Sequence, residues 1–304
     1  TKNIAEEMDD DELSHLSSEL IGQYEADRES RADWEQTYIQ GLDLLGFKME
    51  DRTQPFQGAS GVSHPLLAES VTQFQAQAYK ELLPAGGPVR TQVMGEETDA
   101  TTEQSERVKE FMNYQIIHVM EEFDPELDQM LFYLPLSGSS FKKIYYDQNM
   151  QRAVSKFIPG EELVVPYLAT DLDSCERVTH VIKMMNNDLR KHQVSGFYKD
   201  VELEPYQLDE KDLTAAQRKL EGTQKTTGNM EQHQILEFHA LLDLPGFEDE
   251  DDKGKETGLK LPYIVTIHEE SGKIIGIRRN WREEDDLKNK IPYFVHYKFL
   301  PGLG

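Results

Sequence analysis

The fold class is decided at Leu136–Asp147, LSGSSFKKIYYD, where the spacing of the apolar residues changes along the chain. Before this stretch, four apolar residues share one helical face: Leu127, Met130, Leu131 and Leu134. Asp124-Pro125 predicts the start of that helix, because Asp is a good N-cap and Pro suits the first helical position. After Ser137-Gly138-Ser139 the apolar residues follow a period of two, which is typical of strands.

Downstream of this change the sequence predicts antiparallel strands. Two hairpins are expected, one around Asp147-Gln148-Asn149 and one across Glu269–Gly272: Phe141–Tyr146 with Arg152–Ile158, and Pro262–His268 with Lys273–Arg279. Further strands are expected at Leu163–Tyr167, Arg177–Met185, Ile235–Leu242 and Tyr293–Phe299. Two short helices interrupt them: Asn187–Ser195, closed by Gly196, and Asp212–Leu220 inside a polar insertion that runs to about Gln232.

Upstream of the change the sequence predicts helices. A narrow apolar seam indicates one long helix or two, ending at Gly46 and leaving much surface for water or a partner: Leu13, Leu16, Leu20, Tyr24, Trp34, Tyr38, Leu42 and Leu45. Asp27, Arg28 and Arg31 interrupt this seam. After a Gly/Pro/Ser-rich loop at Pro55–Ser63, we expect a helix over Pro65–Leu83, stopped by Pro84–Pro88.

Two more elements complete the helical part. Val89, Thr91 and Val93 alternate as in a short strand, and a helix is expected from about Thr102 to Glu122. Its apolar side carries Val108, Phe111, Met112, Gln115 and Val119. Helices first and antiparallel strands later indicate an α+β fold, with a helical part at residues 1–136 and a β-rich part at residues 137–304.

The composition excludes several classes of protein. The 304 residues include 32 Lys and Arg against 57 Asp and Glu, a formal net charge of −25, which argues against a surface that wraps nucleic acid. No apolar run approaches a membrane span, and Thr1–Glu7 lacks the features of a signal peptide. The single Cys175 excludes an intrachain disulfide framework and fits a reducing compartment. Without an initiating Met, and with an apolar turn at Tyr297–Gly304, we expect this chain to be part of a longer polypeptide.

No metal or phosphate site is expected. His233, Glu237 and His239 share one face of an alternating strand, which favours a solvated or half-buried sheet face over metal ligands. Glu248–Asp252 lacks the ligand order of a calcium loop and is expected to be a solvated loop tip. Gly58–Gly61 and Pro84–Pro88 are glycine-rich without a phosphate-binding fingerprint. The first precedes a helix, so anion binding there stays conceivable, although a plain connection is favoured.

No catalytic or cofactor-binding residue is expected, so the chain is predicted not to be an enzyme. Cys175 and His180 fall on opposite faces of an extended chain, and no nucleophile elbow occurs. The remaining candidates are basic residues that could touch phosphate: Arg177, Lys183, Arg190, Lys191, Arg278, Arg279 and Arg282. Ordinary pairing with the surrounding acids is the favoured interpretation.

Several stretches resemble one known family. They are LSGSSFKKIYYD at Leu136–Asp147, PYLATDLDSCERVTH at Pro166–His180, Asn187–Lys191 leading to Gly196–Tyr198, and the parts Asp243–Glu248, Leu261–Ile267, Ser271–Lys273, Arg278–Trp281 and Phe294–Gly304. They resemble the portal proteins of tailed bacteriophages, the head–tail connectors of the short-tailed type. The resemblance spans about Val62 to Gly304, and the residues before it match only in being acidic and helical.

The resemblance implies a structural role. Portal proteins form a dodecameric ring at one capsid vertex of the virion, assembled in the host cytoplasm, through which duplex DNA is packaged and ejected without sequence recognition. It implies terminase, tail adaptor proteins and the major capsid or scaffolding protein as partners, with no membrane and no cofactor. The chain would be the wing of such a subunit, with stem, clip and crown beyond residue 304.

Two other function classes are compatible with an acidic α+β chain. A metal-dependent nucleotide-processing enzyme of α+β class is the main alternative, although ordered ligand spacing is missing. A scaffold or tail adaptor is disfavoured by the family resemblance of the stretches between Gly246 and Gly304. The acidity of the chain agrees with a DNA conduit, because negative side chains near the path of the DNA repel its phosphates and lower non-specific binding.

Overall fold

A computed structural model describes residues 3–45, 56, 64–147, 150–205, 232–250 and 253–300. The predicted α+β class is confirmed, because helices accompany two sheets in which every pair of strands is antiparallel. The chain divides into two compact units that interleave along the sequence. The first comprises Thr1–Ile39, Gly160–Pro292 and Leu303–Gly304, and the second comprises Gln40–Pro159 and Tyr293–Gly302. Residues 136 and 137 mark the change from helices to strands, but this point lies inside the second unit.

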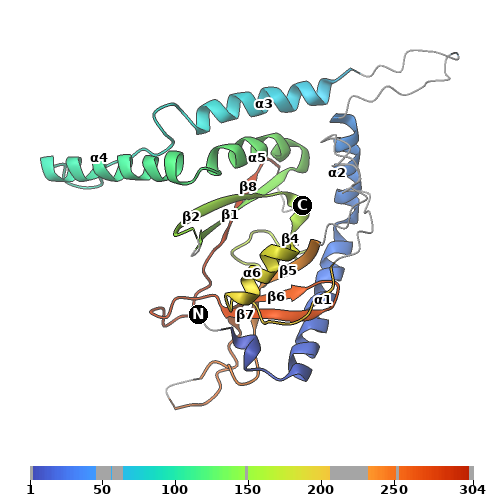
Figure 1. Ribbon diagram of the computed structural model, residues 1–304. Helices are drawn as coiled ribbons and strands as arrows, with labels where there is room; N and C mark the ends of the chain where they lie inside the picture. The colour runs from blue at the N-terminus through green and yellow to red at the C-terminus, as the bar shows by residue number, and fades with distance from the viewer. Residues whose placement is uncertain are drawn as a thin grey trace. The chain divides into compact units, whose positions relative to one another are not determined.

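The first unit is built on a five-stranded sheet with the order β3-β4-β5-β6-β7 (Figure 1). Its strands are β3 (Leu163–Val164), β4 (Arg177–Met185), β5 (Gln232–Leu242), β6 (Leu261–His268) and β7 (Lys273–Arg279). Its helices are η1 (Ile4–Glu6), α1 (Asp10–Ser30), η3 (Gly160–Glu162) and α6 (Asn186–Val194). The expected strand at Leu163–Tyr167 is thus only two residues long, and Pro166 instead opens a turn that Ala169 closes.

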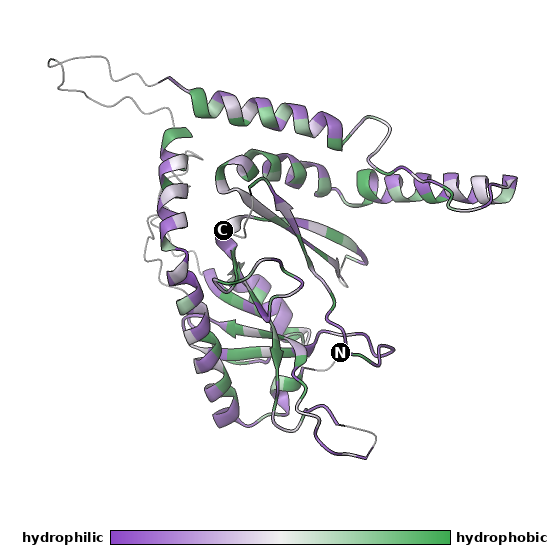
Figure 2. Ribbon diagram, turned by 180° about the vertical axis from the view of Figure 1, so that it is seen from behind, coloured by the Kyte–Doolittle hydropathy of each residue, from purple (hydrophilic) through white to green (hydrophobic). Residues whose placement is uncertain are grey.

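Both faces of this sheet are covered. Leu13, Leu20 and Tyr24 of α1 pack into one apolar cluster with Leu236 and Phe238 of β5. Ile235, the neighbour of Leu236 on β5, points to the opposite face of the sheet. There it packs in a second apolar cluster with Leu189 of α6, Tyr198 and Ile275. Figure 2 shows α1 as a mainly hydrophilic helix broken by hydrophobic residues, as the narrow seam predicts.

The second unit contains a three-stranded sheet with the order β2-β1-β8. Its strands are β1 (Ser139–Asp147), β2 (Arg152–Ile158) and β8 (Phe294–Lys298), and the predicted first hairpin is confirmed by the register Phe141↔Ile158. Its helices are α3 (Leu66–Leu82), α4 (Asp99–Tyr114), the π-helix η2 (Gln115–Val119) and α5 (Phe123–Ser137). The pairing of β8 with β1, register Phe141↔His296, was not predicted.

Helix α5 lies between α3 and the three-stranded sheet (Figure 1). The face predicted for α5 is confirmed, since Leu127, Met130, Leu131 and Leu134 are all buried. Part of that face packs with Phe157 of β2 and with Phe74 of α3. Gly138 ends the helix with a positive φ of 77°, which only glycine adopts without strain.

For the first seam the structure has two helices, one of the two outcomes predicted, and for α4 the predicted start shifts. The first seam forms two helices, α1 and α2 (Ala32–Leu45), which separate at Arg31. The guanidinium of Arg31 donates hydrogen bonds to the carbonyls of Gly160, Glu161 and Leu163. Helix α4 begins at Asp99 because Thr98 and Thr101 form a capping box.

The start predicted for α5 is wrong by two residues, and so is its N-cap. The helix begins at Phe123 with Glu122 at the N-cap, whereas Asp124 accepts a hydrogen bond from the Tyr79 hydroxyl. The Asp124 carboxylate therefore bonds to a side chain of α3 and does not cap the N-terminus of α5.

The strand predicted at Val89–Val93 is also wrong. This segment does not pair in either sheet, because the side chain of Asn113 in α4 takes the place of a neighbouring strand. Asn113 accepts from the Val89 N–H at 2.9 Å and donates to the Val89 carbonyl at 3.2 Å. The helix Asp212–Leu220, the Gly58–Gly61 loop and Gly46 lie outside the described residues.

Candidate functional site

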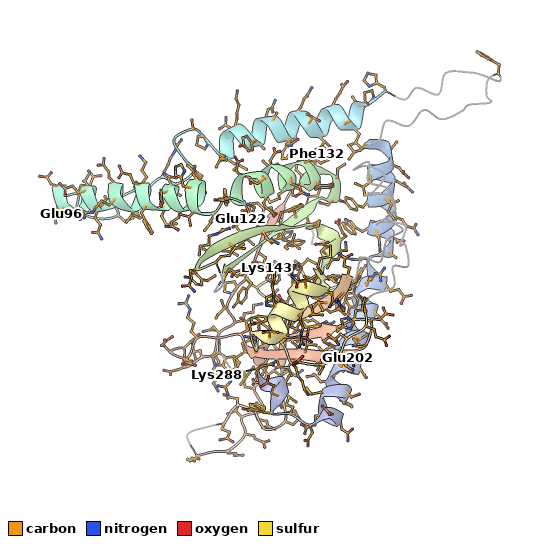
Figure 3. The ribbon with its side chains drawn as sticks, viewed as in Figure 1. Glu96, Glu122, Phe132, Lys143, Glu202 and Lys288 are labelled. Carbon is orange, nitrogen blue, oxygen red and sulfur yellow. The ribbon has the colours of Figure 1, made fainter. Side chains whose placement is uncertain are left out.

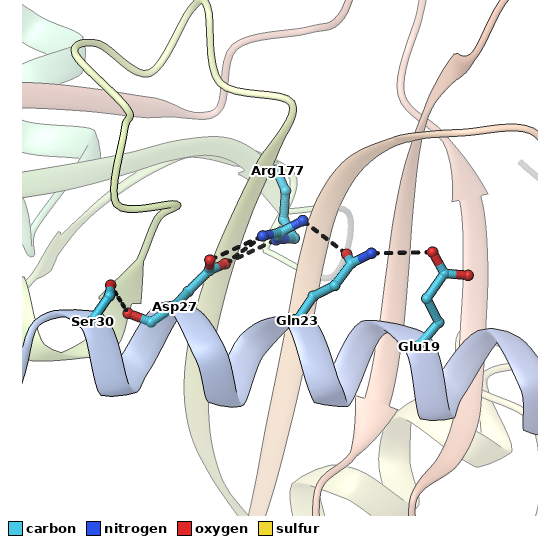
Figure 4. A network of polar contacts seen from close by, with 5 residues as sticks. All are labelled: Glu19, Gln23, Asp27, Ser30 and Arg177. Carbon is cyan, nitrogen blue, oxygen red and sulfur yellow. Dashed lines mark hydrogen bonds and ion pairs between the residues drawn. The ribbon is translucent and has the colours of Figure 1, made fainter.

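The basic residues singled out in the sequence are distributed among acids rather than gathered into one patch. Figure 4 shows Arg177 of β4 against α1, where its guanidinium donates to both carboxylate oxygens of Asp27 at 2.9 and 3.0 Å. It also donates to Gln23, whose amide donates to Glu19. Both ionic side chains are largely buried, 18% exposed for Arg177 and 9% for Asp27. Asp27, which interrupts the apolar seam of α1, is therefore the ion-pair partner of the buried Arg177.

The other members of the first basic stretch have acidic partners too. Lys183 lies 3.4 Å from Glu162, and Lys191 lies 2.8 Å from Asp188. Arg190 pairs with Asp200. These pairings support the interpretation that the sequence favoured, because each positive charge is already compensated.

The second basic group is held by aromatic rings. The guanidinium of Arg278 lies 3.6 Å from the centre of the Phe197 ring and donates to the Phe197 carbonyl. Arg279 lies 5.6 Å from the ring centre of Trp281. In these cation–π contacts the guanidinium groups interact with rings of the same chain rather than with a phosphate group.

The three residues of the histidine pattern on β5 have different partners. His239 lies 2.6 Å from the carboxylate of Glu237. His233 instead forms a 3.0 Å hydrogen bond with His268, whose other ring nitrogen bonds Ser271 at 2.9 Å. The expectation of a solvated or half-buried face is wrong for His233, which is 1% exposed. Burial, together with His233 and Lys273, lowers the pKa of His268 to about 4, so this ring is neutral at physiological pH.

The acidic run and the cysteine have structural partners. Asp249 pairs with Lys288 and accepts from the Thr257 hydroxyl at 2.6 Å, so its expected place at a solvated loop tip is wrong. These hydrogen bonds lower the pKa of Asp249. The Cys175 thiol donates to the Asp171 carbonyl, and burial raises its pKa, so the thiolate is disfavoured. Residues 251–252 of the acidic run lie outside the described residues.

The loop Pro84–Pro88 is explained by a close approach. Gly87 has a φ of 89°, and a Cβ there would lie 2.3 Å from the Asn113 side-chain oxygen. Glycine at this position therefore lets Asn113 reach the backbone of Val89. The loop allows close packing of Gly87 against Asn113. Local sequence could not predict this contact, because the two residues are 26 positions apart in the chain.

The second unit contains a buried lysine whose burial the sequence analysis did not predict. Lys142 on β1 is 1% exposed, and its ammonium lies 4.1 Å from the centre of the Phe123 ring. Its Nζ has no hydrogen-bond partner among the described residues. Burial lowers the pKa of Lys142 to about 8, while Glu126 and Glu122 raise it.

An exposed apolar surface lies at the end of α4 and on the π-helix η2. Five large apolar side chains over ten residues are between 42% and 60% exposed: Val108, Phe111, Met112, Tyr114 and Ile117. Within α4 the one buried residue is Asn113, which faces the Val89 segment. Figure 3 shows side chains projecting from this helix on all sides, with Glu96 near its N-terminal end. We call these five residues the α4 apolar surface.

No protein-family model and no curated protein matches the chain. Among the described residues, no group of three or more His, Cys, Asp or Glu side chains could hold a metal ion. None of the described helices is both long enough and apolar enough to cross a membrane.

Proposed function

We propose that this chain is a structural subunit of a bacteriophage portal ring at the capsid vertex of the virion. It would form part of the conduit for packaging and ejection of duplex DNA, and part of the docking point for terminase and tail. The observation that carries the proposal, beside the resemblance of Leu136–Asp147 and the later stretches, is the α4 apolar surface. Several large apolar side chains that are exposed close together on one helix are typical of a contact with another protein. A neighbouring subunit of a ring would cover it.

The charge distribution supports the same proposal. A conduit must let DNA slide, so its basic side chains should be compensated. Arg177, Lys183, Arg190 and Lys191 each pair with an acid. The alternative of a metal-dependent nucleotide-processing enzyme would need a cluster of metal ligands, and the described residues contain no group of three or more His, Cys, Asp or Glu side chains that could hold a metal ion.

The proposal is tested by the oligomeric state of the full-length chain. Mass photometry and negative-stain images at micromolar concentration should show closed rings. Phe111→Glu should abolish rings without lowering the melting temperature, because Phe111 is 60% exposed. Gln104→Glu, which adds the same charge to an exposed polar position of α4, is the matched control. A full-length chain that stays monomeric contradicts the proposal.

A further inference from the structure

Three of the four sheet edges are closed by side chains. On β2, every second N–H points away from β1, and two of these donate to carboxylates of α5 and its N-cap. The Ser155 N–H donates to Glu122 at 3.1 Å, and the Phe157 N–H donates to Glu126 at 2.7 Å. Glu122 and Glu126 lie one helical turn apart, which matches the spacing of alternate N–H groups along a strand. No further strand can pair with β2 while these carboxylates occupy its donors.

The two edges of the five-stranded sheet are closed in the same manner. Asn3 accepts from the Ile277 N–H at 2.9 Å and donates to the Ile275 carbonyl at 3.1 Å on β7. Arg31 donates to the Leu163 carbonyl on β3. Natural proteins block sheet edges in such ways because an open edge pairs with other chains.

On the remaining edge, that of β8, the outward backbone groups of His296 and Lys298 have no hydrogen-bond partner among the described residues. Ile144 and Gly138 of the neighbouring segment bond to Tyr293 and Phe299, so odd-numbered residues of β8 face β1. The N–H and C=O groups of His296 and Lys298 therefore point away from the sheet. No hydrogen bond among the described residues reaches the backbone of these two residues on that side.

A strand-like segment of the same unit has an open side as well. In the extended segment Val89–Val93, Asn113 occupies the N–H and C=O of Val89. Because backbone groups alternate along an extended chain, those of Arg90 and Gln92 point to the opposite side. The described residues contain no hydrogen bond to the Arg90 or Gln92 backbone. The segment runs beside α4, which extends away from α5 and the sheet (Figure 1).

The Val89–Val93 segment and strand β8 both lie in stretches of sequence without acidic residues. No Asp or Glu occurs from Leu82 to Gly95 or from Leu287 to Gly304, although the chain contains 57 of them. Two copies with a formal net charge of −25 repel each other, so contacts between copies are most favourable where acids are absent.

We propose that the Val89–Val93 segment of one copy pairs with the open edge of β8 in a second copy, as an added strand. This inference deepens the proposed ring and rests on it, since it names the contact between neighbouring subunits. The two surfaces are different, so the contact is head-to-tail, the kind of interface that can close into a ring. It also explains why a segment with a strand pattern has no strand partner among the described residues of its own chain.

Disulfide trapping tests the pairing. In a Cys175→Ser background, Arg90→Cys or Gln92→Cys copies are mixed with Lys298→Cys copies of the full-length chain and oxidised. Cross-strand neighbours lie within the roughly 4.4–6.8 Å Cα separation that a disulfide needs, so a covalent dimer should form in the mixture. Lys156→Cys, exposed on the closed edge of β2, replaces Lys298→Cys as the matched control and should give none.

A disulfide forms only if the two strands pair in the expected register. A proline variant and amide exchange test the pairing without that condition. Lys298→Pro removes an outward N–H without disturbing the bonds between β8 and β1. It should weaken assembly at least tenfold while the monomer melts as before. In assembled protein, the amides of Arg90, Gln92 and His296 should exchange more slowly than in the monomer.

The outcomes separate this inference from the proposed function. Rings without the disulfide and without protection of these amides overturn the strand pairing and leave the portal proposal standing. A disulfide-linked open polymer supports the pairing and contradicts the closed ring. Monomers that give neither disulfide nor protection overturn both. Protection that a different protein, rather than a second copy, confers on His296 also overturns the pairing.

Discussion

The ammonium of Lys142 lies 4.1 Å from the centre of the Phe123 ring, on a strand position that is 1% exposed. The cation–π contact compensates only part of the lost hydration, because Nζ has no hydrogen-bond partner among the described residues. Lys142→Met should therefore raise the free energy of unfolding at pH 7 by about 1 kcal/mol. Urea denaturation of both proteins measures this, with the neighbouring Lys143→Met as control. A destabilised Lys142→Met protein would mean that the cation is needed for packing.

The same lysine predicts a pH dependence. Its folded pKa of about 8 is lower than the ordinary 10.5, so between these values the unfolded chain binds more protons. Stability should thus rise with pH in this window, by roughly 1–2 kcal/mol relative to Lys142→Met, and should show no such difference in slope below pH 7. Parallel stability curves for the two proteins from pH 7 to 10.5 would contradict the lowered pKa.

The buried ion pair between Arg177 and Asp27 should be costly to break from one side. Asp27→Ala leaves a guanidinium without its carboxylate and should lower the free energy of unfolding by about 2–3 kcal/mol. The double variant Asp27→Ala, Arg177→Met should recover part of this loss, which a double-mutant cycle measures. Asp188→Ala, which removes the partner of Lys191 in an exposed pair, should change stability by less than about 1 kcal/mol. Equal effects at the two sites would argue that Arg177 is solvated.

Phe141 belongs to the core of the second unit. It is 1% exposed and stacks on His296, with ring centres 4.7 Å apart. Phe141→Ala should lower the free energy of unfolding by about 3–5 kcal/mol. Tyr146→Ala on the other face of the same strand should have a small effect, since Tyr146 is 59% exposed. Thermal melting distinguishes the two, and an unchanged midpoint for Phe141→Ala would mean that the register of β1 is wrong.

Asn113 should control the order of the segment beside α4. Asn113→Ala leaves the N–H and C=O of Val89 without their partner, at a cost of about 1–3 kcal/mol where they are buried. We expect faster amide exchange at Val89 and faster tryptic cleavage after Arg90. Glu110→Ala, at an exposed position of the same helix, should leave both rates unchanged. Unchanged cleavage in Asn113→Ala would show that the segment is held elsewhere.

Duplex DNA should bind weakly. Non-specific binding requires several phosphates to be neutralised together, whereas five of the candidate basic side chains are engaged with acids or a ring: Arg177, Lys183, Arg190, Lys191 and Arg278. Fluorescence anisotropy with a labelled duplex should show no saturable binding below about 10 μM at physiological salt, and no sequence preference. Saturable sub-micromolar binding under these conditions would return nucleic-acid recognition to consideration.

Much of the local structure was predictable, because periodicity reports which side of a helix or strand is apolar. The seam of Leu13, Leu20 and Tyr24, the buried face of α5 and the two hairpins follow from spacing alone. The same reasoning marked Phe111 and Met112 as one apolar side of a helix, yet both are exposed. Periodicity identifies an apolar face but does not say whether the same chain covers it.

The partners of each element were decided by tertiary structure. β8 pairs with β1 across about 150 residues, and Asn113 occupies the backbone that a strand partner of Val89 would have used. Lys142 is buried because α5 lies over a strand position that the local sequence marks as polar. Such contacts depend on which distant surfaces meet, and the free energy of burial and hydrogen bonding that selects them is not encoded in neighbouring residues. The sequence by itself determined the α+β class and most of the helices and strands, because apolar spacing is a local property. Only the tertiary structure decided which sheet edges are closed by side chains and which have no partner among the described residues, because that depends on which distant segments meet.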